Sequence, residues 1–313
     1  MTRTEFFTDA AAFDAAIGML LAKDPIGSTM VASVLANHIA APVAGGQPLL
    51  LAVLDGDRVP AAAIRIPNFP MLVVIDPAIP DPATLLDELA GAVIGRSEPI
   101  VGVSGRRRTA ELLASAWTAR SGTLARQRMS TLFFRLGRLR EPVGVPGAAR
   151  PFDVTDPADV ALLAEWFCEF RRETGVGRTP PVPDPDTLLH NVRRGEVFTI
   201  WCADGRPVAA AGHSALRRDG SCRIAPVYTP PDHRRRGFAS AVTAAAVRSA
   251  HGLGATEVTL FTDAEYPASN AVYRRLGFES VAEFAEIDFL SEASPAASAS
   301  STSPKADQAS SLS

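Results

Sequence analysis

The pattern of apolar and polar positions in the second half of the chain changes repeatedly between the period of a helix and that of a strand. After Asp156-Pro157, a pair typical of a helix start, apolar residues recur every three or four positions until Gly175. Another helix is expected over about 237–251. Runs of β-branched or alternating apolar residues predict strands at 152–154, 197–201, 207–216, 222–229, 257–262 and within 278–289.

The first half shows a weaker version of the same pattern. An Asp-Gly turn joins two apolar runs into an expected hairpin over 49–66, and further strands are expected at 71–76 and 100–105. A helix is expected over 108–122. Strands that alternate with helices predict an α/β fold built on a mixed sheet. The two halves are candidates for divergent repeats, although their identity is too low to establish this from the residues alone.

Proline and glycine interrupt the pattern between the halves. The stretch 138–151 is rich in both and has no periodic apolar spacing, so it is expected to be a linker. The Ser- and Ala-rich end of the chain has no aromatic residue and is expected to be disordered. We therefore expect a first domain at 1–140, a linker at 141–151, a second domain at 152–290 and a tail at 291–313.

Composition narrows the classes of partner. The 313 residues include 31 Lys and Arg against 34 Asp and Glu, and the net charge of −3 gives no reason to expect nucleic acid or an anionic membrane as a partner. The cysteines form no Cys-x-x-Cys pair and no cluster with histidine, so no metal site is expected. The chain shows neither a signal-peptide pattern nor an apolar run long enough for a bilayer, and a cytoplasmic location is expected.

Three arginines, Arg234 to Arg236, precede Gly237 where the second expected helix begins. The first N–H groups of a helix have no internal partner, and the helix dipole adds partial positive charge. Gly237 permits a ligand to approach the backbone, and Ala239 has almost no side chain to obstruct it. The turn therefore suits a diphosphate, although it has the sequence of neither a P-loop nor a dinucleotide turn. Taken alone, it fits an exposed basic helix start equally well.

A second motif follows about 40 residues later. The segment SNAVYRRLGF at 269–278 contains an Asn, a Tyr three positions on, and then Gly-Phe. Together with Arg234-x-x-Gly237-x-Ala239 it resembles the hallmarks of the GNAT superfamily of acyl-CoA-dependent N-acetyltransferases, over roughly residues 150–290. The chain also resembles a bacterial subgroup of that superfamily with a degenerate N-terminal half. This resemblance implies a mixed, mostly antiparallel twisted sheet flanked by helices, in two tandem copies.

The resemblance also implies roles for individual residues. Val227 and Thr229 would lie on a strand that splays from its neighbour and offers backbone groups to the pantetheine arm of acetyl-CoA, the implied donor. Arg234 opens the phosphate turn, and Asn270 would contact the cofactor near the end of that arm. The backbone amides that would hold the pyrophosphate of coenzyme A belong to Arg235, Arg236, Gly237, Phe238, Ala239 and Ser240.

Tyr273 is the expected catalytic residue. The resemblance implies a place near the thiol sulfur, and the spacing of three from Asn270 puts both residues on one face of a helix. Expulsion of a thiolate with a pKa of about 8.5 is assisted by a proton from a phenol with a pKa of about 10. The competing interpretation is a packed aromatic side chain with its hydroxyl on the surface.

No general base can be named from the sequence. The strand that ends before the turn has no carboxylate, whereas many members of the family carry a Glu there. Glu165, Glu169 and Glu173 repeat on one helix face, but such a stripe is more typical of a solvated surface. Asp263 fits a turn cap, and His213 fits a hydrogen-bonded, half-buried histidine. The base is then water, or the substrate arrives neutral.

The first half is not expected to bind coenzyme A. Its expected counterpart of the phosphate turn, VGVSGRRRTAELLA at 101–114, contains Gly and Arg without the spacing of the motif. No Asn-x-x-Tyr follows, and this half contains no tyrosine. We expect the first half to pack against the second and to shape the acceptor cleft, because clefts form at domain interfaces.

The leading interpretation is an N-acetyltransferase. The acetyl group of acetyl-CoA would pass to a primary amine of a small molecule or peptide by direct attack in a ternary complex, since no Cys–His pairing suggests a covalent route. One alternative is a non-catalytic acyl-CoA-binding or regulatory protein, which the missing Glu favours. Another is an acyltransferase with a different acyl donor. The sequence indicates neither the acceptor nor the oligomeric state.

Overall fold

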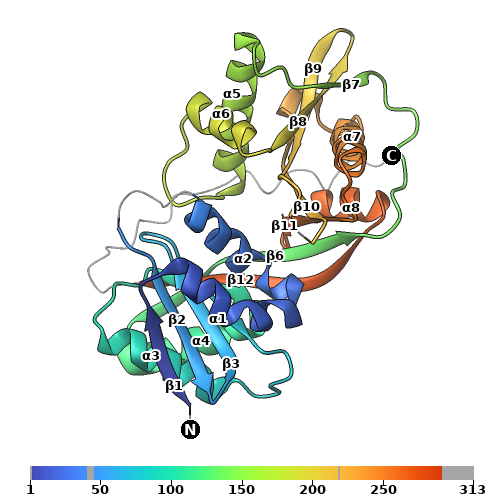
Figure 1. The fold of residues 1–313 in the computed structure, drawn as a ribbon. Helices are drawn as coiled ribbons and strands as arrows, with labels where there is room; N and C mark the ends of the chain where they lie inside the picture. The colour runs from blue at the N-terminus through green and yellow to red at the C-terminus, as the bar shows by residue number, and fades with distance from the viewer. Residues whose placement is uncertain (1, 41–45, 218, 291–313) are drawn as a thin grey trace, which may run out of the picture.

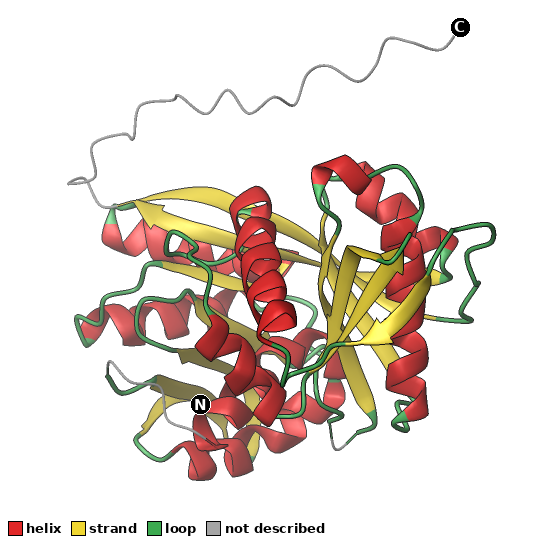
Figure 2. Ribbon diagram, turned by 90° about the horizontal axis from the view of Figure 1, so that it is seen from above, coloured by secondary structure: helices red, strands yellow, loops and turns green. Residues whose placement is uncertain are grey.

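A computed structural model describes residues 2–40, 46–217 and 219–290, and the expected tail at 291–313 lies outside these. Within them, twelve strands form one sheet in the order β1-β2-β3-β4-β5-β12-β6-β11-β10-β9-β8-β7. The sheet is mixed and mostly antiparallel, with parallel pairing at β4–β5 and β10–β11. Helices flank the strands on both sides (Figures 1 and 2). The predicted fold class is therefore confirmed.

Each half of the chain follows the same order of elements. The first half runs through β1 (Arg3–Phe7), α1 (Ala10–Lys23), α2 (Pro25–Ala40), β2 (Leu49–Asp55), β3 (Arg58–Arg65), β4 (Met71–Ile75), α3 (Ala83–Gly95), β5 (Gly102–Arg106), α4 (Arg107–Ser121) and β6 (Leu124–Leu136). The second half runs through β7 (Ala148–Pro151), α5 (Pro157–Thr174), α6 (Pro185–Arg193), β8 (Val197–Ala203), β9 (Arg206–His213), β10 (Ser221–Tyr228), the short 3₁₀ helix η1 (Pro231–His233), α7 (Phe238–Gly252), β11 (Glu257–Asp263), α8 (Pro267–Arg275) and β12 (Phe278–Leu290). The two halves are thus repeats in topology.

The final strand of each half is exchanged. β12 of the second half pairs with β5 of the first, and β6 of the first half pairs with β11 of the second. β6 and β12 also pair with each other along almost their whole length, and they run side by side through the middle of the molecule (Figure 1). Each half therefore depends on the other to complete its part of the sheet.

Apolar side chains cover both faces of the sheet in each half. In the second half, α5 and α6 pack on one face through Leu163 and Leu188, which contact Phe198 and Ile200 of β8. On the other face α7 approaches closely, because most of its buried residues are alanines. Helix α2 of the first half reaches the exchanged strands through Ile26, which packs against a cluster of phenylalanines. The two halves consequently share their apolar packing.

Most of the predicted elements are present, with two corrections. The strand expected at 152–154 lies at 148–151 instead, inside the expected linker, because this segment pairs with β8 as an edge strand where prolines are tolerated. The region 278–289, expected to hold more than one strand, is the single strand β12. The helix predicted between Asp156 and Gly175 is confirmed, with the Asp156 carboxylate accepting from the Ala158 N–H at its start. None of the described helices has the length and apolar content needed to cross a membrane.

Candidate active site

The parallel strands β10 and β11 separate before they end. They pair at three positions, from Ser221 opposite Glu257 to Arg223 opposite Thr259, and not beyond. A register irregularity between Ile224 and Val227 displaces β10 at this point, whereas β11 continues along β6 as far as Asp263. A widening gap between two parallel strands at their carboxyl ends is where ligands bind in open α/β sheets.

The turn from β10 to α7 contains two residues with left-handed backbone conformation. Arg235 has φ of 62° and Gly237, the residue before α7, has φ of 82°. Left-handed residues at a helix start are a conformation that can aim successive backbone N–H groups toward one side, as anion sites require. A Cβ on Gly237 would lie 2.9 Å from Val145 Cγ2 of the linker, so glycine is required for packing as well as for conformation. The first turn of α7 is formed by Phe238, Ala239 and Ser240.

The Arg234 side chain is held by contacts with neighbouring residues of the protein. Its Nε donates to the backbone oxygen of Thr229 at 2.9 Å, and its Nη2 lies 2.5 Å from the Glu173 carboxylate of α5. The guanidinium also sits 5.9 Å from the ring centre of Tyr228. The two following arginines are exposed, and Arg236 stacks over Phe238 at 4.9 Å. Arg235 and Arg236, rather than Arg234, are therefore placed to attract an anion over a distance.

Glu173 has contacts that the sequence did not predict. Besides Arg234 it binds the hydroxyl of Tyr228, which donates to Oε1 at 3.1 Å. Burial, together with the Glu173 charge, raises the pKa of Tyr228 to about 12. Glu173 is exposed, as expected of a solvated stripe, but it also links the last turn of α5 to the end of β10. Of the other two members, Glu165 is exposed and Glu169 pairs with Arg172.

Asn270 and Tyr273 lie on α8, beside the carboxyl end of β11. Asn270 is 3% exposed, and its side-chain N–H₂ donates to the backbone oxygen of Asp263 at 3.1 Å. Its Oδ1 is buried and accepts no hydrogen bond from the described residues. The ring of Tyr273 packs 6.3 Å from that of Phe134 and 6.0 Å from that of Phe278. Because β6 is exchanged, one wall of the Tyr273 environment belongs to the first half.

Burial raises the pKa of the Tyr273 phenol to about 12. The phenol therefore stays protonated at every pH at which the protein would work, and can act as a donor. No hydrogen-bond partner for its hydroxyl is found among residues 2–40, 46–217 and 219–290, so the donor is available to a ligand.

The two strand residues expected at the pantetheine arm differ in their surroundings. Val227 pairs with Ala211 of β9 on the side of β10 away from the gap. Thr229 is buried, its Oγ1 has no partner among the described residues, and its backbone oxygen already accepts from Arg234. The group of Thr229 that remains for a ligand is thus its hydroxyl.

Two of the alternative bases have structural roles. His213 is buried, with Nδ1 2.9 Å from the Ser214 backbone oxygen and Nε2 3.2 Å from Ser249 Oγ. Asp263 Oδ1 accepts from the N–H of Glu265 at 2.8 Å, which is a turn cap. Both side chains are occupied by neighbouring residues. In the described part of the chain, no group of three or more His, Cys, Asp or Glu side chains gathers as it would around a metal ion.

The order of elements shows which segment of the first half corresponds to the phosphate turn between β10 and α7. Because β4, α3 and β5 correspond to β10, α7 and β11, the counterpart is the loop 76–82 and not 101–114, which forms β5 and the start of α4. In this loop Pro77, Pro80 and Pro82 lack the N–H groups that a phosphate needs. Asp76 is 1% exposed and lies 2.5 Å from the Lys23 ammonium, whose hydrogen bond lowers the pKa of the Asp76 carboxyl.

A second ion pair lies beside the loop 76–82 of the first half. Arg106 donates through Nε and Nη2 to the two oxygens of Asp24, at 2.6 and 2.8 Å. Both pairs line a pocket of about 380 Å³ between the ends of β4 and β5. The Lys23 and Arg106 cations of this pocket are already bound to the carboxylates of Asp76 and Asp24, so this pocket is chemically unlike the turn at Gly237.

Comparison with known proteins agrees with this geometry. The family model described as the acetyltransferase (GNAT) family matches residues 161–278, and no curated protein matches the chain. A GCN5-related N-acetyltransferase from Sphaerobacter thermophilus has a similar structure, with 17% identity over 91% of this chain and 95% of its own and a TM-score of 0.60. One from Kribbella flavida shares 19% identity over 85% and 96%, with a TM-score of 0.53.

A tandem GNAT protein from the clavulanic acid biosynthesis pathway is also similar, with 14% identity, 92% of this chain and 98% of its own covered, and a TM-score of 0.56. At these identities the structural likeness shows a shared fold, which here extends over both halves. The match to the family model indicates the class of activity, which is acyl transfer. The chain therefore carries an acetyltransferase domain of the GNAT family at residues 161–278, and the reaction of that family is acyl transfer.

Proposed function

We propose that the protein transfers the acetyl group of acetyl-CoA to a primary amine by direct attack in a ternary complex. The observation that carries this proposal is the gap between β10 and β11, which opens beside the left-handed turn at Arg235 and Gly237. In the reaction the amine nitrogen forms a bond to the thioester carbon and the C–S bond breaks. The electron pair of that bond leaves on sulfur, and the products are an N-acetyl amide and coenzyme A.

The cofactor would be held mainly by backbone groups. We assign its pyrophosphate to the amides from Arg235 through Ser240, and its pantetheine arm to the gap beside Val227 and Thr229. Asn270 Oδ1 is buried without a donor, and an amide N–H of the pantetheine arm would satisfy it. Two exposed arginines at the turn would attract the phosphates.

Tyr273 is proposed to donate to the departing sulfur. With its pKa raised to about 12, the phenol is a weaker acid than the leaving thiol, so it would stabilise the developing thiolate by a hydrogen bond to sulfur and not by full proton transfer. The protein offers no carboxylate on β10 as a base, and Glu173 is held by Arg234 and Tyr228. We therefore propose that the ammonium form of the acceptor loses one proton to water before attack, and that a second N–H proton passes to water as the amide forms and the thiolate leaves.

The proposed acetyl transfer also suggests the roles of the domains and the location of the protein. We propose 152–290 as the catalytic unit, extended to include β7 at Ala148–Pro151, the rest of 141–151 as the linker, and 1–140 as a degenerate GNAT-like unit that shapes the acceptor side. A cytoplasmic location is proposed because Cys168, Cys202 and Cys222 are all free thiols.

The test is release of free thiol from acetyl-CoA in the presence of a panel of primary amines. We expect release that depends on the amine and yields its N-acetyl derivative in equal amount. The second candidate function is a non-catalytic acyl-CoA-binding protein, which the absence of a carboxylate on β10 favours. Tight acetyl-CoA binding without thiol release across the whole panel would support that candidate and exclude the enzyme.

A further inference from the structure

A pocket of about 470 Å³ lies between the loop after α5 and the exchanged strands β6 and β12. Four arginines line it, together with one carboxylate among the described lining residues, Asp288. The arginines are Arg128, Arg171, Arg172 and Arg178. Neither the phosphate turn nor Tyr273 belongs to this lining. A pocket this rich in guanidinium groups is suited to an anion.

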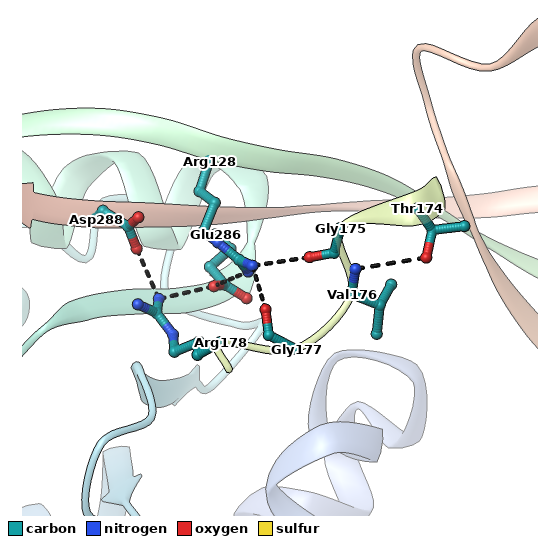
Figure 3. A network of polar contacts seen from close by, with 8 residues as sticks. All are labelled: Arg128, Thr174, Gly175, Val176, Gly177, Arg178, Glu286 and Asp288. Carbon is teal, nitrogen blue, oxygen red and sulfur yellow. Dashed lines mark hydrogen bonds and ion pairs between the residues drawn. The ribbon is translucent and has the colours of Figure 1, made fainter. Parts of the chain in front are cut away.

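Two of the arginines form a fixed wall (Figure 3). Arg128 of β6 donates to Glu286 at 2.8 Å and to the backbone oxygens of Gly175 and Gly177. Arg178 donates to the same Glu286 oxygen at 2.7 Å and to Asp288 at 2.6 Å. The two carboxylates of β12 are therefore neutralised by these arginines, and the carbonyl oxygens at the end of α5 are covered by Arg128.

The other two arginines leave one positive charge without a close partner. Arg172 pairs with Glu169 on the same helix. The guanidinium of Arg171 makes no hydrogen bond or ion pair within the described parts of the chain, and its backbone oxygen accepts only from the Gly175 N–H that ends α5. Its guanidinium lies along Gly177, where a Cβ would come within 3.0 Å of Nη2. The pKa of the Asp184 carboxyl is lowered chiefly by the Thr187 N–H, and the charge of Arg171 adds to this from farther away.

The pocket is adjacent to the proposed reaction centre. Arg171 and Arg172 lie on the last turn of α5, and the same turn carries Glu173, which binds Tyr228 at the end of β10. Arg171 and Glu173 are two positions apart on this turn and project to opposite sides of the helix, whose diameter is ~10 Å, so the pocket and the Tyr228 end of β10 lie on opposite sides of one helix. A single extended acceptor could reach from one to the other.

We propose that this pocket binds the anionic end of the acceptor, with Arg171 as its contact residue. The acceptor would then be a primary amine with a carboxylate no more than ~10 Å away, a span limited by the helix diameter. This inference rests on the proposed acetyl transfer, because it assigns the second end of the amine that is acetylated. The bidentate geometry of a guanidinium suits a carboxylate, and Arg171 is the arginine not already bound to one.

The test compares three probes of equal length: 6-aminohexanoate, hexylamine and 1,6-diaminohexane. Each is titrated calorimetrically into the full chain saturated with coenzyme A, so that binding is measured without turnover. We expect 6-aminohexanoate to bind at least tenfold more tightly than the other two. Arg171→Gln should weaken its binding about tenfold or more, the effect of losing a charge-assisted hydrogen bond. Arg193→Gln, an exposed arginine in the last turn of α6, is the matched control and should change nothing.

Equal binding of the three probes, including no measurable binding of any, would overturn the pocket assignment. So would an affinity of Arg171→Gln for 6-aminohexanoate within twofold of the unaltered protein. Thiol release measured with the same probes separates this inference from the proposed function. Binding that depends on Arg171 without any thiol release would leave the pocket standing and remove the enzyme. Thiol release that is equal for hexylamine and 6-aminohexanoate, and unchanged in Arg171→Gln, would do the reverse.

Discussion

At the scale of single residues, Tyr273 carries the most direct part in the proposed chemistry. Tyr273→Phe removes the proton donor and keeps the ring contacts with Phe134 and Phe278. We expect kcat to fall about 100-fold or more, with the Kd for acetyl-CoA and the melting temperature little changed. Because burial raises the pKa of this phenol to about 12, the unaltered enzyme should lose no activity through its ionisation below about pH 11. Single-turnover rates within twofold of each other would remove Tyr273 from the mechanism.

Glu173→Gln distinguishes a positioning role from a catalytic one. The Glu173–Arg234 pair is more than one-third exposed on both sides, and such pairs contribute little, about 0.2–1 kcal/mol. We therefore expect at most a fivefold change in kcat and in the KM for acetyl-CoA. A loss of about 100-fold in kcat alone, measured with acetyl-CoA saturating, would instead identify Glu173 as the general base.

The residues that could be predicted from the sequence are those whose role is set by local backbone. The Arg-x-x-Gly turn and the Asn-x-x-Tyr pair each lie within one short segment, and the structure places them on either side of the gap between β10 and β11. Glu173 could not be predicted in the same way. Its partners Tyr228 and Arg234 are 55 and 61 positions away, and a Glu stripe on a helix gives no signal of such a contact.

At the scale of elements, local patterns predicted most strands but missed the helices α1, α2, α3 and α6, and they did not predict how the strands pair. β6 was not predicted because its first half is exposed and mostly polar, so the alternation of apolar and polar residues that marks a strand is weak there. The exchange of β6 and β12 was also invisible, since the apolar pattern of a strand specifies which face is buried and not which neighbour it has. The exchange bears on the proposed chemistry because it brings Phe134 of the first half against Tyr273.

Phe134→Leu tests this contact between the halves. Phe134 is fully buried, and the substitution should cost about 1 kcal/mol of stability. We expect kcat to fall severalfold as well, because the ring that positions Tyr273 is lost. Phe133→Leu is the matched control: Phe133 is the next residue of β6 and packs against Phe261 and Phe284 instead. It should lower the melting temperature similarly and leave kcat unchanged. The same kcat for both variants would contradict a role for the exchanged strand.

At the scale of the whole molecule, two repeats share one sheet and differ in their turns. The resemblance implied a tandem arrangement, and the structural relatives include a tandem GNAT protein. The counterpart of the phosphate turn was misplaced at 101–114 because its three arginines imitate the motif, whereas the order of elements places it at 76–82. There, prolines and the buried Asp76 replace free amides and a glycine. We therefore expect each chain to bind one molecule of acetyl-CoA, in its second half.

Calorimetric titration with acetyl-CoA tests this expectation most directly, using Ser240→Asp. Ser240 is the third residue of α7, where a carboxylate favours the helix by about 0.3–1 kcal/mol but would repel the pyrophosphate. Gly237 is less suitable, since any side chain there also strains the backbone and meets Val145. We predict one site per chain in the unaltered protein, an affinity at least tenfold lower in Ser240→Asp, and near-normal affinity in the neutral control Ser240→Asn. Two sites per chain, or equal affinities in the two variants, would contradict the account.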